Sequence, residues 1–387
     1  MNLCDHNSQT SASILKSVAA KALLTLLDGR ESLFFDRIAL TEGGFRKDSV
    51  SPHRTVVALL GLLHFAESGL PHSFDLEAIE EAIFRDTRWV SGIGDLGILL
   101  RFAAECKPNR LASIINQFDL ENALNLFLDG RQAQTAPLAC FLAGISHARL
   151  GSRDVPLDLT DVAVDTYRLL KNNQGAGGIF VHAGCPSFLQ QPFSNRFGTF
   201  ADQADSIYAL VTFARAFDIE EPLADALNCA NVIRALQGDK GQWWFLYDKR
   251  SCRVVNHYPV RSVYQDGLAP MALMTLEEAT GQKFQEAVCK GLSWIAGANE
   301  LGADLRDFER GVIWESIALK SRIAGLRNAG LRNVGLSFGH KGHTNGKNLQ
   351  VCFEARPDHF GWLLYALSRF GFSGDALVAK VATVSQS

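Results

Sequence analysis

Helical segments of two kinds alternate along this chain of 387 residues, and the alternation constrains the fold more than any other feature. Almost wholly apolar runs begin near residues 52, 94, 135, 201, 265 and 358, and an amphipathic run precedes each of them. A helix that is apolar all round is buried, whereas an amphipathic helix covers a core with one face. The pattern therefore predicts six hairpins, each made of an outer helix followed by an inner helix.

The inner runs also resemble one another. Ala58-Leu-Leu-Gly-Leu-Leu-His64 and Phe141-Leu-Ala-Gly-Ile-Ser-His147 carry glycine at matching places, Gly61 and Gly144, where a small residue lets two helix backbones approach. Weak self-similarity at the period of a helix pair indicates a repeated helical unit. We therefore predict an all-α fold, a closed (α/α)6 toroid of six helical hairpins that forms a single domain over residues 1–387, and a parallel sheet would contradict it.

Two interruptions and a final helix complete this prediction. Residues 243–258 are expected to form a small β-hairpin, the only one in the fold. A glycine-rich insertion is expected near 297–356, and its segment 325–348 is either a lid over the mouth of the ring or a tolerated surface insertion. A short terminal helix is predicted at 375–384.

Composition narrows the functional classes. The chain is 47% hydrophobic, which suits one large core, and its formal net charge of −3 argues against a nucleic-acid partner. No apolar run reaches the roughly 18 residues that a membrane-spanning helix needs. No basic segment leads into an apolar one at the N-terminus, so no signal peptide is expected. The eight cysteines include no C-x-x-C pair, which favours free thiols and a cytoplasmic location.

Two turns carry the same motif. Gln237-x-x-x-Gly241-x-Trp243 follows an outer run, and the looser Gln174-x-x-x-Gly178-x-Phe180 stands at the equivalent place. The Gln amide can bind exposed carbonyls at a helix end, the Gly permits the turn, and the aromatic ring packs under the next helix. This motif resembles the turns of α/α-toroid proteins, both six-hairpin glycosidase-like enzymes and terpenoid cyclases. The resemblance covers most of the chain, implies the toroid fold, and identifies no individual family.

Diagnostic motifs of several toroid families are absent from this sequence. The D-x-D-D motif of class II terpene cyclases does not occur, and the nearest segment, Asp202-Gln-Ala-Asp205, is spaced differently. The D-D-x-x-D motif that binds Mg²⁺ is also absent. His182 and Cys185 lack a second cysteine at a zinc-site spacing, and His340 and His343 lie in the glycine-rich insertion. We therefore expect no metal and no cofactor.

In such a ring the N-terminal ends of the inner helices share one mouth, where free N–H groups suit polar ligands. The catalytic candidates at these helix starts are Asp202, Tyr264, Asp266 and His359. The substrate-binding candidates are Arg196, Asp205, His257, Glu354, Arg356 and Trp362. We expect one pocket to be lined by Arg196, Asp202, Tyr264, Asp266, Arg356 and His359. Structural alternatives stand beside these roles: Asp202 and Asp266 can cap helices, and Arg356 can pair with Glu354.

Asp202 and Asp266 open adjacent inner helices, whose axes should lie roughly 8–10 Å apart. Their carboxylates can then fall in the window of about 5–9.5 Å that glycoside chemistry uses. One is expected to act as general acid and the other as base or nucleophile, with Arg196 and His359 orienting a sugar or uronic acid. The alternatives are a terpenoid cyclase-like protein with an isoprenoid substrate, and a non-catalytic partner in a biosynthetic cluster. The oligomeric state is left open.

Overall fold

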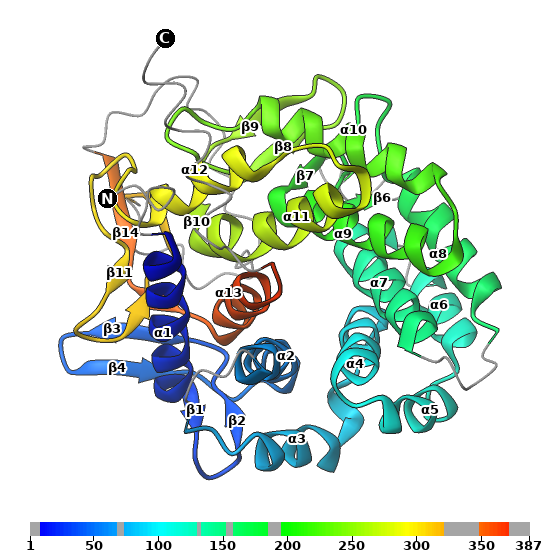
Figure 1. The fold of residues 1–387 in the computed structure, drawn as a ribbon, viewed down its shortest axis with the longest axis horizontal. Coiled ribbons are helices and arrows are strands. Elements are labelled where there is room, and N and C mark those ends of the chain that lie inside the picture. The colour runs from blue at the N-terminus through cyan, green and yellow to red at the C-terminus, as the bar shows by residue number, and fades with distance from the viewer. Residues whose placement is uncertain are drawn as a thin grey trace.

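The computed structural model describes residues 8–67, 73–129, 133–151, 158–184, 195–320 and 348–370, and its helices form two concentric rings (Figure 1). Contacts join each inner helix to the next around the ring and the last back to the first, so the inner ring is closed. The inner helices are α2 (Pro52–Glu67), α4 (Ile93–Cys106), α7 (Thr135–Gly151), α9 (Phe200–Phe217), α11 (Ala269–Thr280) and α13 (Pro357–Arg369).

The outer ring surrounds these helices, and one of its members or pairs precedes each inner helix in the chain (Figure 1). The outer helices are α1 (Ser8–Leu26), α3 (Leu76–Arg85), α5 (Pro108–Gln117) with α6 (Leu120–Asp129), α8 (Thr160–Asn172), α10 (Glu221–Ala235) and α12 (Gln285–Ile295). The predicted (α/α)6 toroid of six hairpins is therefore confirmed. The glycine-rich segment 325–348, apart from Asn348, and the helix predicted at 375–384 fall outside the described residues.

Glycine pairs set the closest helix contacts of the inner ring. A Cβ atom on Gly61 would lie 2.1 Å from the carbonyl oxygen of Gly361, and one on Gly144 would lie 2.2 Å from that of Gly97. Real Cβ atoms do not approach that closely, so α2 meets α13, and α4 meets α7, with backbone against backbone. The expectation that Gly61 and Gly144 mark close helix approaches is confirmed.

The Gln side chains of the turn motif bind backbone carbonyls, but these belong to the turn and to the next outer helix, and not to the end of a helix as expected. The Gln237 amide donates to the carbonyl of Gly241 at 3.0 Å and to that of Ala287 in α12 at 2.9 Å. Gln174 makes the equivalent bonds, to Gly178 at 3.1 Å and to Asp225 in α10 at 3.0 Å. Each motif thus joins the end of one outer helix to the next outer helix. Gly178 and Gly241 have φ values of 95° and 91°, a conformation that favours glycine.

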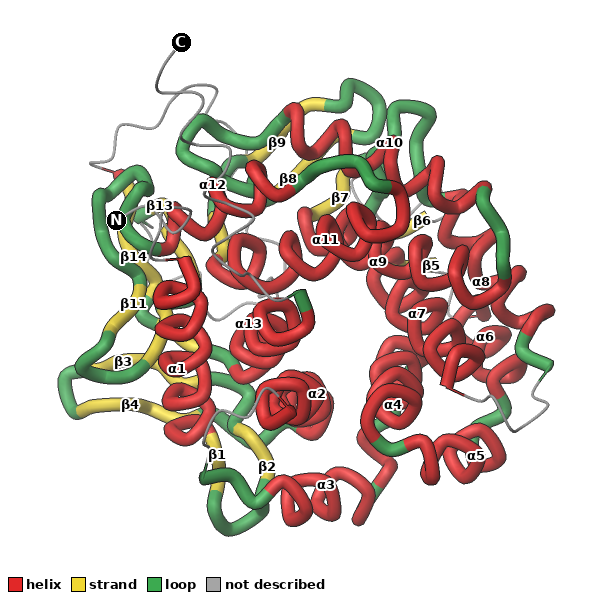
Figure 2. The backbone as a smooth tube through the Cα atoms, viewed as in Figure 1, coloured by secondary structure: helices red, strands yellow, loops and turns green. Residues whose placement is uncertain are grey.

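Short antiparallel strands at the rim form six small sheets among the described residues, and Figure 2 draws them in yellow. The sheets are β1 (Leu27–Asp28) with β2 (Leu33–Phe34); β3 (Ile38–Thr41) with β4 (Gly44–Lys47) and β15 (Glu354–Ala355); β5 (Ala133–Gln134) with β6 (Ala183–Gly184); β7 (Phe197–Thr199) with β8 (Leu246–Asp248) and β9 (Arg253–Asn256); β10 (Val260–Arg261) with β13 (Ser316–Leu319) and β14 (Leu349–Cys352); and β11 (Arg306–Asp307) with β12 (Val312–Ile313).

The predicted hairpin at 243–258 is confirmed as β8 and β9. The expectation that it is the only one is wrong, because strands of two to four residues are too short to show a periodicity of two. Several strands lead directly into inner helices: β5 into α7, β7 into α9 and β15 into α13. These strands therefore fix how the chain enters the mouth of the ring. Among the described helices, none is long and apolar enough to cross a membrane.

Candidate active site

A pocket of about 550 Å³ opens at the N-terminal ends of the inner helices. Its wall includes residues from the first two turns of α2, α4, α7, α9 and α13, and from the segment that leads into α11. Because every inner helix start contributes, the pocket lies at the mouth where the sequence places it. Five of the candidates from the sequence line it: Asp205, Tyr264, Arg356, His359 and Trp362.

Asp205 differs from the other carboxyl groups of the pocket wall because no described residue binds it. It lies in the second turn of α9 and lines the pocket, and no hydrogen bond joins its carboxyl group to the described part of the chain. Burial, together with the nearby carboxylate of Asp202, raises the pKa of Asp205 to about 7, although the Arg101 guanidinium opposes the shift. At neutral pH this group therefore exchanges a proton readily, as a general acid must.

Asp95 is the second carboxylate of the wall, and its surroundings differ. It lies in the first turn of α4, where its Oδ1 is 2.7 Å from His53 Nδ1 and its Oδ2 accepts hydrogen bonds from the amide and hydroxyl of Ser91. Burial would raise the pKa of Asp95, but the hydrogen bonds from His53 and Ser91 lower it below its ordinary value. Asp95 is therefore ionised at neutral pH.

His359 and Asp266 form a buried pair beside the pocket. His359 Nε2 lies 2.8 Å and 3.0 Å from the two oxygens of Asp266, whose side chain is fully buried. Burial raises the pKa of Asp266, and the contact with His359 opposes the shift. Only His359 lines the pocket, so Asp266 acts on it through the imidazole. A carboxylate that binds one ring nitrogen orients a histidine and fixes its tautomer.

Tyr264 and Asp266 lie on a single π turn, Tyr264–Leu268, at the start of α11. Such turns are rare and occur often at functional sites. The Tyr264 ring lines the pocket, and within the described residues its hydroxyl makes no hydrogen bond. Burial raises the pKa of Tyr264 to about 12, so the hydroxyl stays protonated and can donate a hydrogen bond.

Three arginines form the rim on one side of the pocket: Arg54, Arg261 and Arg356. Each is partly neutralised. Arg261 and Arg356 both bind Glu315, at 2.7 Å and 3.1 Å, and Arg54 pairs with Asp358 and with Asp36. The remaining guanidinium N–H groups suit hydroxyl or carboxylate substituents of a ligand. Trp362 offers an apolar surface on the wall of the same pocket.

The other catalytic candidate, Asp202, is buried in the cap of α9. Its carboxylate accepts from the amide and hydroxyl of Thr199, and the Thr199 hydroxyl accepts from the Asp202 amide, which is a complete capping box. His182 approaches the same carboxylate at 3.3 Å, and this contact raises the pKa of His182. Asp202 is therefore absent from the pocket wall because the cap holds its oxygens.

Arg196, Glu354 and His257 also lie elsewhere. Arg196 pairs with Asp248 at 2.7 Å, across β7 and β8. Glu354 binds Arg37 at 3.0 Å, and Arg356 binds Glu315. The alternative in which Glu354 pairs with Arg356 is therefore wrong. The His257 ring stands edge-on to Trp244, with 4.5 Å between ring centroids. None of the three is among the residues that line the pocket.

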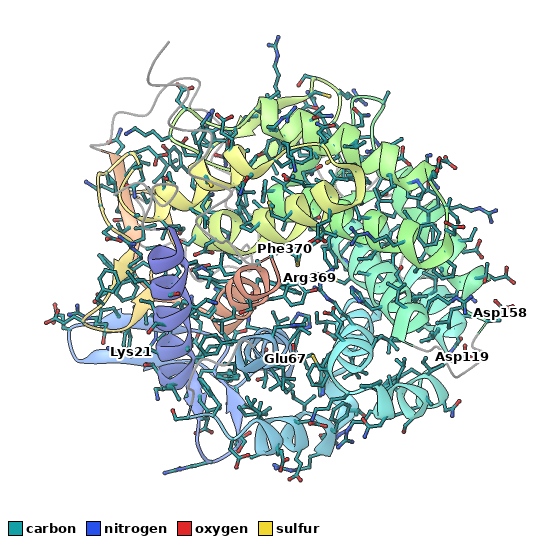
Figure 3. The ribbon with its side chains drawn as sticks, viewed as in Figure 1. Lys21, Glu67, Asp119, Asp158, Arg369 and Phe370 are labelled. Atoms are coloured by element: carbon teal, nitrogen blue, oxygen red, sulfur yellow. The ribbon has the colours of Figure 1, made fainter. Side chains whose placement is uncertain are left out.

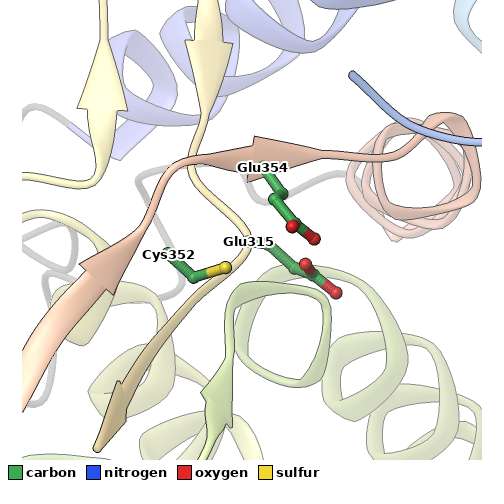
Figure 4. A group of neighbouring side chains, drawn as sticks. All are labelled: Glu315, Cys352 and Glu354. Carbon is green, nitrogen blue, oxygen red and sulfur yellow. The ribbon is translucent and has the colours of Figure 1, made fainter. Parts of the chain in front are cut away.

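One group of potential metal ligands occurs among the described residues: Glu315, Cys352 and Glu354, whose ligand atoms all lie within 4.8 Å of one another (Figure 4). Arginines already neutralise both carboxylates, Arg261 and Arg356 at Glu315 and Arg37 at Glu354. Burial raises the pKa of Cys352 to about 11, so its thiol stays protonated. This donor set does not suit a divalent cation, which needs free carboxylates and a thiolate.

Sequence reasoning missed Asp95 and Glu315. Asp95 carries the signal used for other sites, an acidic residue in the first turn of an inner helix. Glu315 lies inside the segment 297–356, where strands β13 and β14 bring it to the rim. That position depends on strand pairing between distant residues, for which a single sequence offers no local signal.

No protein-family model matches the chain, and no curated protein matches its sequence. Solved structures match over almost its whole length. An unsaturated glucuronyl hydrolase specific for heparin has a TM-score of 0.56 and 14% identity, over 93% of this chain and 96% of that chain. A possible GH105 family member from Salmonella enterica subsp. enterica serovar Paratyphi A has a TM-score of 0.56 and 12% identity, over 93% of both chains.

A GH76 α-mannanase from Bacteroides thetaiotaomicron is similar in fold as well. Its TM-score is 0.55 and its identity 10%, over 94% of this chain and 97% of that chain. At such identities the similarity concerns the fold, which these glycosidases share although their names differ in substrate. The resemblance to the α/α-toroid superfamily is therefore confirmed at the level of the fold, with no individual family identified.

Proposed function

We propose that this protein is a carbohydrate-active enzyme, of hydrolase, lyase or epimerase type, in which Asp205 is the general acid. One observation carries the proposal: a carboxyl group that no described residue binds, with a pKa of about 7, lies on the wall of a pocket of about 550 Å³. Perturbed carboxyl groups in such pockets are typical of acid–base catalysts.

Asp95 complements Asp205 in this mechanism. The surroundings push the pKa values of the two carboxyl groups apart, upward for Asp205 and downward for Asp95. Such a separation assigns the protonated group the role of acid and the ionised group that of base, nucleophile or charge stabiliser. Both carboxylates act on the Cys140 thiol, whose pKa they help to raise, so they flank the start of α7.

Asp202 and Asp266, the catalytic aspartates proposed from the sequence, do not line the pocket but contact or influence residues that do. Asp202 sits beside Asp205, and its charge helps to keep Asp205 protonated. Asp266 orients His359, which with Tyr264 can bind or transfer protons at the wall. The catalytic set proposed from the sequence thus keeps Tyr264 and His359 as contact residues, with Asp202 and Asp266 as their support.

The substrate that suits this pocket is a sugar or a sugar acid. Its wall combines three arginines, four carboxyl groups and two histidines with apolar side chains, among them Phe245 and Trp362. Such a mixed lining suits the hydroxyl groups and the apolar faces of a sugar ring. The fold neighbours named as glucuronyl hydrolases and a mannanase support the same class. A cytoplasmic location is supported by the free thiols of the described cysteines.

The test is a screen of uronate-containing and neutral oligosaccharides, first by thermal shift and then by turnover. A binder should raise the melting temperature through mass action. Asp205→Asn should bind the same ligand and lose about 10²–10⁴-fold in kcat. Asp165→Asn, an exposed carboxylate on α8, is the matched control and should keep full activity. Binding without turnover by the wild-type protein would favour a non-catalytic toroid, and normal turnover by Asp205→Asn would remove the acid role.

A further inference from the structure

A second, much smaller cavity lies beneath the pocket, inside the inner ring. Its volume is about 20 Å³, and it shares Ile98, Cys140, Asp205 and Trp362 with the wall of the large pocket. Arg101, Tyr208 and Met271 also line it. Asp205 and Trp362 therefore border both spaces.

Arg101 is the buried cation of this small cavity. Only 4% of its surface is exposed, and its guanidinium lies over the rings of Tyr208, Tyr365 and Trp362, at 4.2, 4.5 and 4.9 Å from their centroids. Its Nε donates to Glu105 at 2.8 Å. Among the described residues, its Nη1 and Nη2 atoms meet only the sulfur of Met271, each at 3.8 Å. Two strong donors therefore lack an oxygen acceptor.

The cavity has the size and the lining for one water molecule. A buried water needs about 10–15 Å³ and two to four polar partners. Within the part of the chain that the structure describes, Arg101 supplies donors without an oxygen partner and Asp205 supplies an acceptor without a partner, and both line the cavity. Buried donors and acceptors left without partners are costly, and a bridging water satisfies them at little entropic cost.

We infer that Arg101 is a positioning residue for Asp205: its Nη groups hold one water in the small cavity, and this water donates a hydrogen bond to the Asp205 carboxyl group from below. One oxygen of Asp205 is then bound inside the ring, and the other is left for the ligand in the large pocket. The bridging water itself does not depend on the proposed function. Only its consequence, that it orients a general acid, rests on that proposal.

The other charged or titratable groups around Asp205 do not replace Arg101. Asp202 is a like charge on the same helix, Cys140 on α7 is kept protonated, and Tyr264 lies on the π turn as a neutral phenol. Tyr208 lines the small cavity, but its hydroxyl is already bound to His147 at 2.8 Å and to Tyr365 at 3.1 Å. Arg101 is the cation that acts on Asp205.

Two measurements test the inference without any substrate. The first is a high-resolution crystal structure, which should show one water within hydrogen-bond distance of both an Arg101 Nη atom and an Asp205 oxygen. The second is the pKa of Asp205, followed by ¹³C NMR with carboxyl-labelled aspartate and assigned by loss of the signal in Asp205→Asn. In Arg101→Met/Glu105→Gln, where both partners of the buried ion pair are neutral, this pKa should rise by about 1–3 units.

Two further variants separate positioning from general damage. Arg101→Lys keeps a cation at the site, so the pKa of Asp205 in this variant should stay close to its value in the wild-type protein. Arg369→Gln removes another cation of the ring floor, one that binds Tyr365 and does not line the small cavity, and should leave that pKa unchanged. Arg369 is labelled near the centre of the ring in Figure 3.

An Asp205 pKa that stays unchanged in the folded double variant would overturn the inference. If that variant does not fold, a wild-type crystal structure without the bridging water would overturn it instead. Failure of the proposed function can be told apart from failure of this inference. Normal turnover by Asp205→Asn would remove the catalytic role of Asp205, but it would change neither the bridging water nor the effect of Arg101 on the Asp205 pKa.

Discussion

His359 and Asp266 are joined by a two-oxygen contact, with Nε2 of the imidazole 2.8 Å and 3.0 Å from the carboxylate oxygens, in the wall between the pocket and the core. The π turn Tyr264–Leu268 places Asp266 behind His359, while Tyr264 on the same turn lines the pocket. The two residues therefore form one hydrogen-bonded pair, of which only the histidine lines the pocket.

The first prediction follows from this pair. His359→Asn should lower kcat by about 10²–10⁴-fold if the imidazole transfers or holds a proton. Asp266→Asn should lower it less, because the ring stays in place while its tautomer is no longer fixed. The double variant should be no worse than His359→Asn alone, since residues that act as a unit are not additive. Steady-state kinetics measure this, and additive losses would show that the two residues act independently.

The second prediction concerns stability and pH. The pKa of Asp205 is about 7 in the folded protein against an ordinary value of 3.8, so the folded state binds the proton more tightly than the unfolded chain. The contribution of this group to folding is therefore fully present below about pH 4, is lost as pH rises, and is absent above about pH 7. Asp205→Asn should then raise the free energy of unfolding at pH 8 by up to about 4 kcal/mol.

Chemical denaturation at pH 8 and at pH 3.5 measures this difference. The gain should vanish at the lower pH, where the carboxyl group is protonated in both states. Asp165→Asn should change neither value, because that side chain is exposed. Equal stability of Asp205→Asn and wild type at pH 8 would show that Asp205 is not held in a costly environment.

The fold was predictable because its signals are local. The apolar and amphipathic runs and the Gln174 and Gln237 turns each depend on a few neighbouring residues. In both turns the Gln amide binds the carbonyl of the glycine four residues later. The break between α5 and α6 near Asp119 has a local cause as well, since Asp119 Oδ1 accepts from the Asn122 amide and begins α6.

The site was predictable only in part. Thr199-x-x-Asp202 is a capping-box spacing, and this signal could have shown that the Asp202 carboxylate is bound in the cap, which leaves Asp205, one turn further along the helix, for the pocket wall. By contrast, the pairing of Arg196 with Asp248 depends on the register of β7 and β8, and the rim position of Glu315 depends on that of β13 and β14. Such registers are set by tertiary contacts, which one sequence does not display.

The third prediction tests the glycine contacts of the inner ring. Gly97→Ala and Gly144→Ala should each destabilise the protein by about 1–3 kcal/mol or more, because the added methyl group meets the backbone of the facing helix. Gly29→Ala is the control, since a Cβ atom there has nothing within 4 Å and should leave the melting temperature almost unchanged. Thermal unfolding followed by circular dichroism measures both, and equal melting temperatures would contradict the backbone contact.

The last prediction is the pH profile of the reaction. With Asp205 as acid and Asp95 as base or nucleophile, kcat/KM should be bell-shaped. It should fall as pH rises through about 7, where Asp205 loses its proton, and fall again on the acid side, below the ordinary range of an aspartate, where Asp95 gains one. His53→Phe removes the hydrogen bond at 2.7 Å that lowers the pKa of Asp95, so the acid limb should move to higher pH while the basic limb stays in place.

His257→Gln supplies the matched control for this profile, because His257 does not line the pocket and its loss should move neither limb. If the acid limb of the kcat/KM profile does not move in His53→Phe, Asp95 is not the group that must be ionised for activity. In that case the His359 and Asp266 pair becomes the remaining base on the wall, and Asp266→Asn should then shift the same limb. The two variants therefore decide between the two candidate bases.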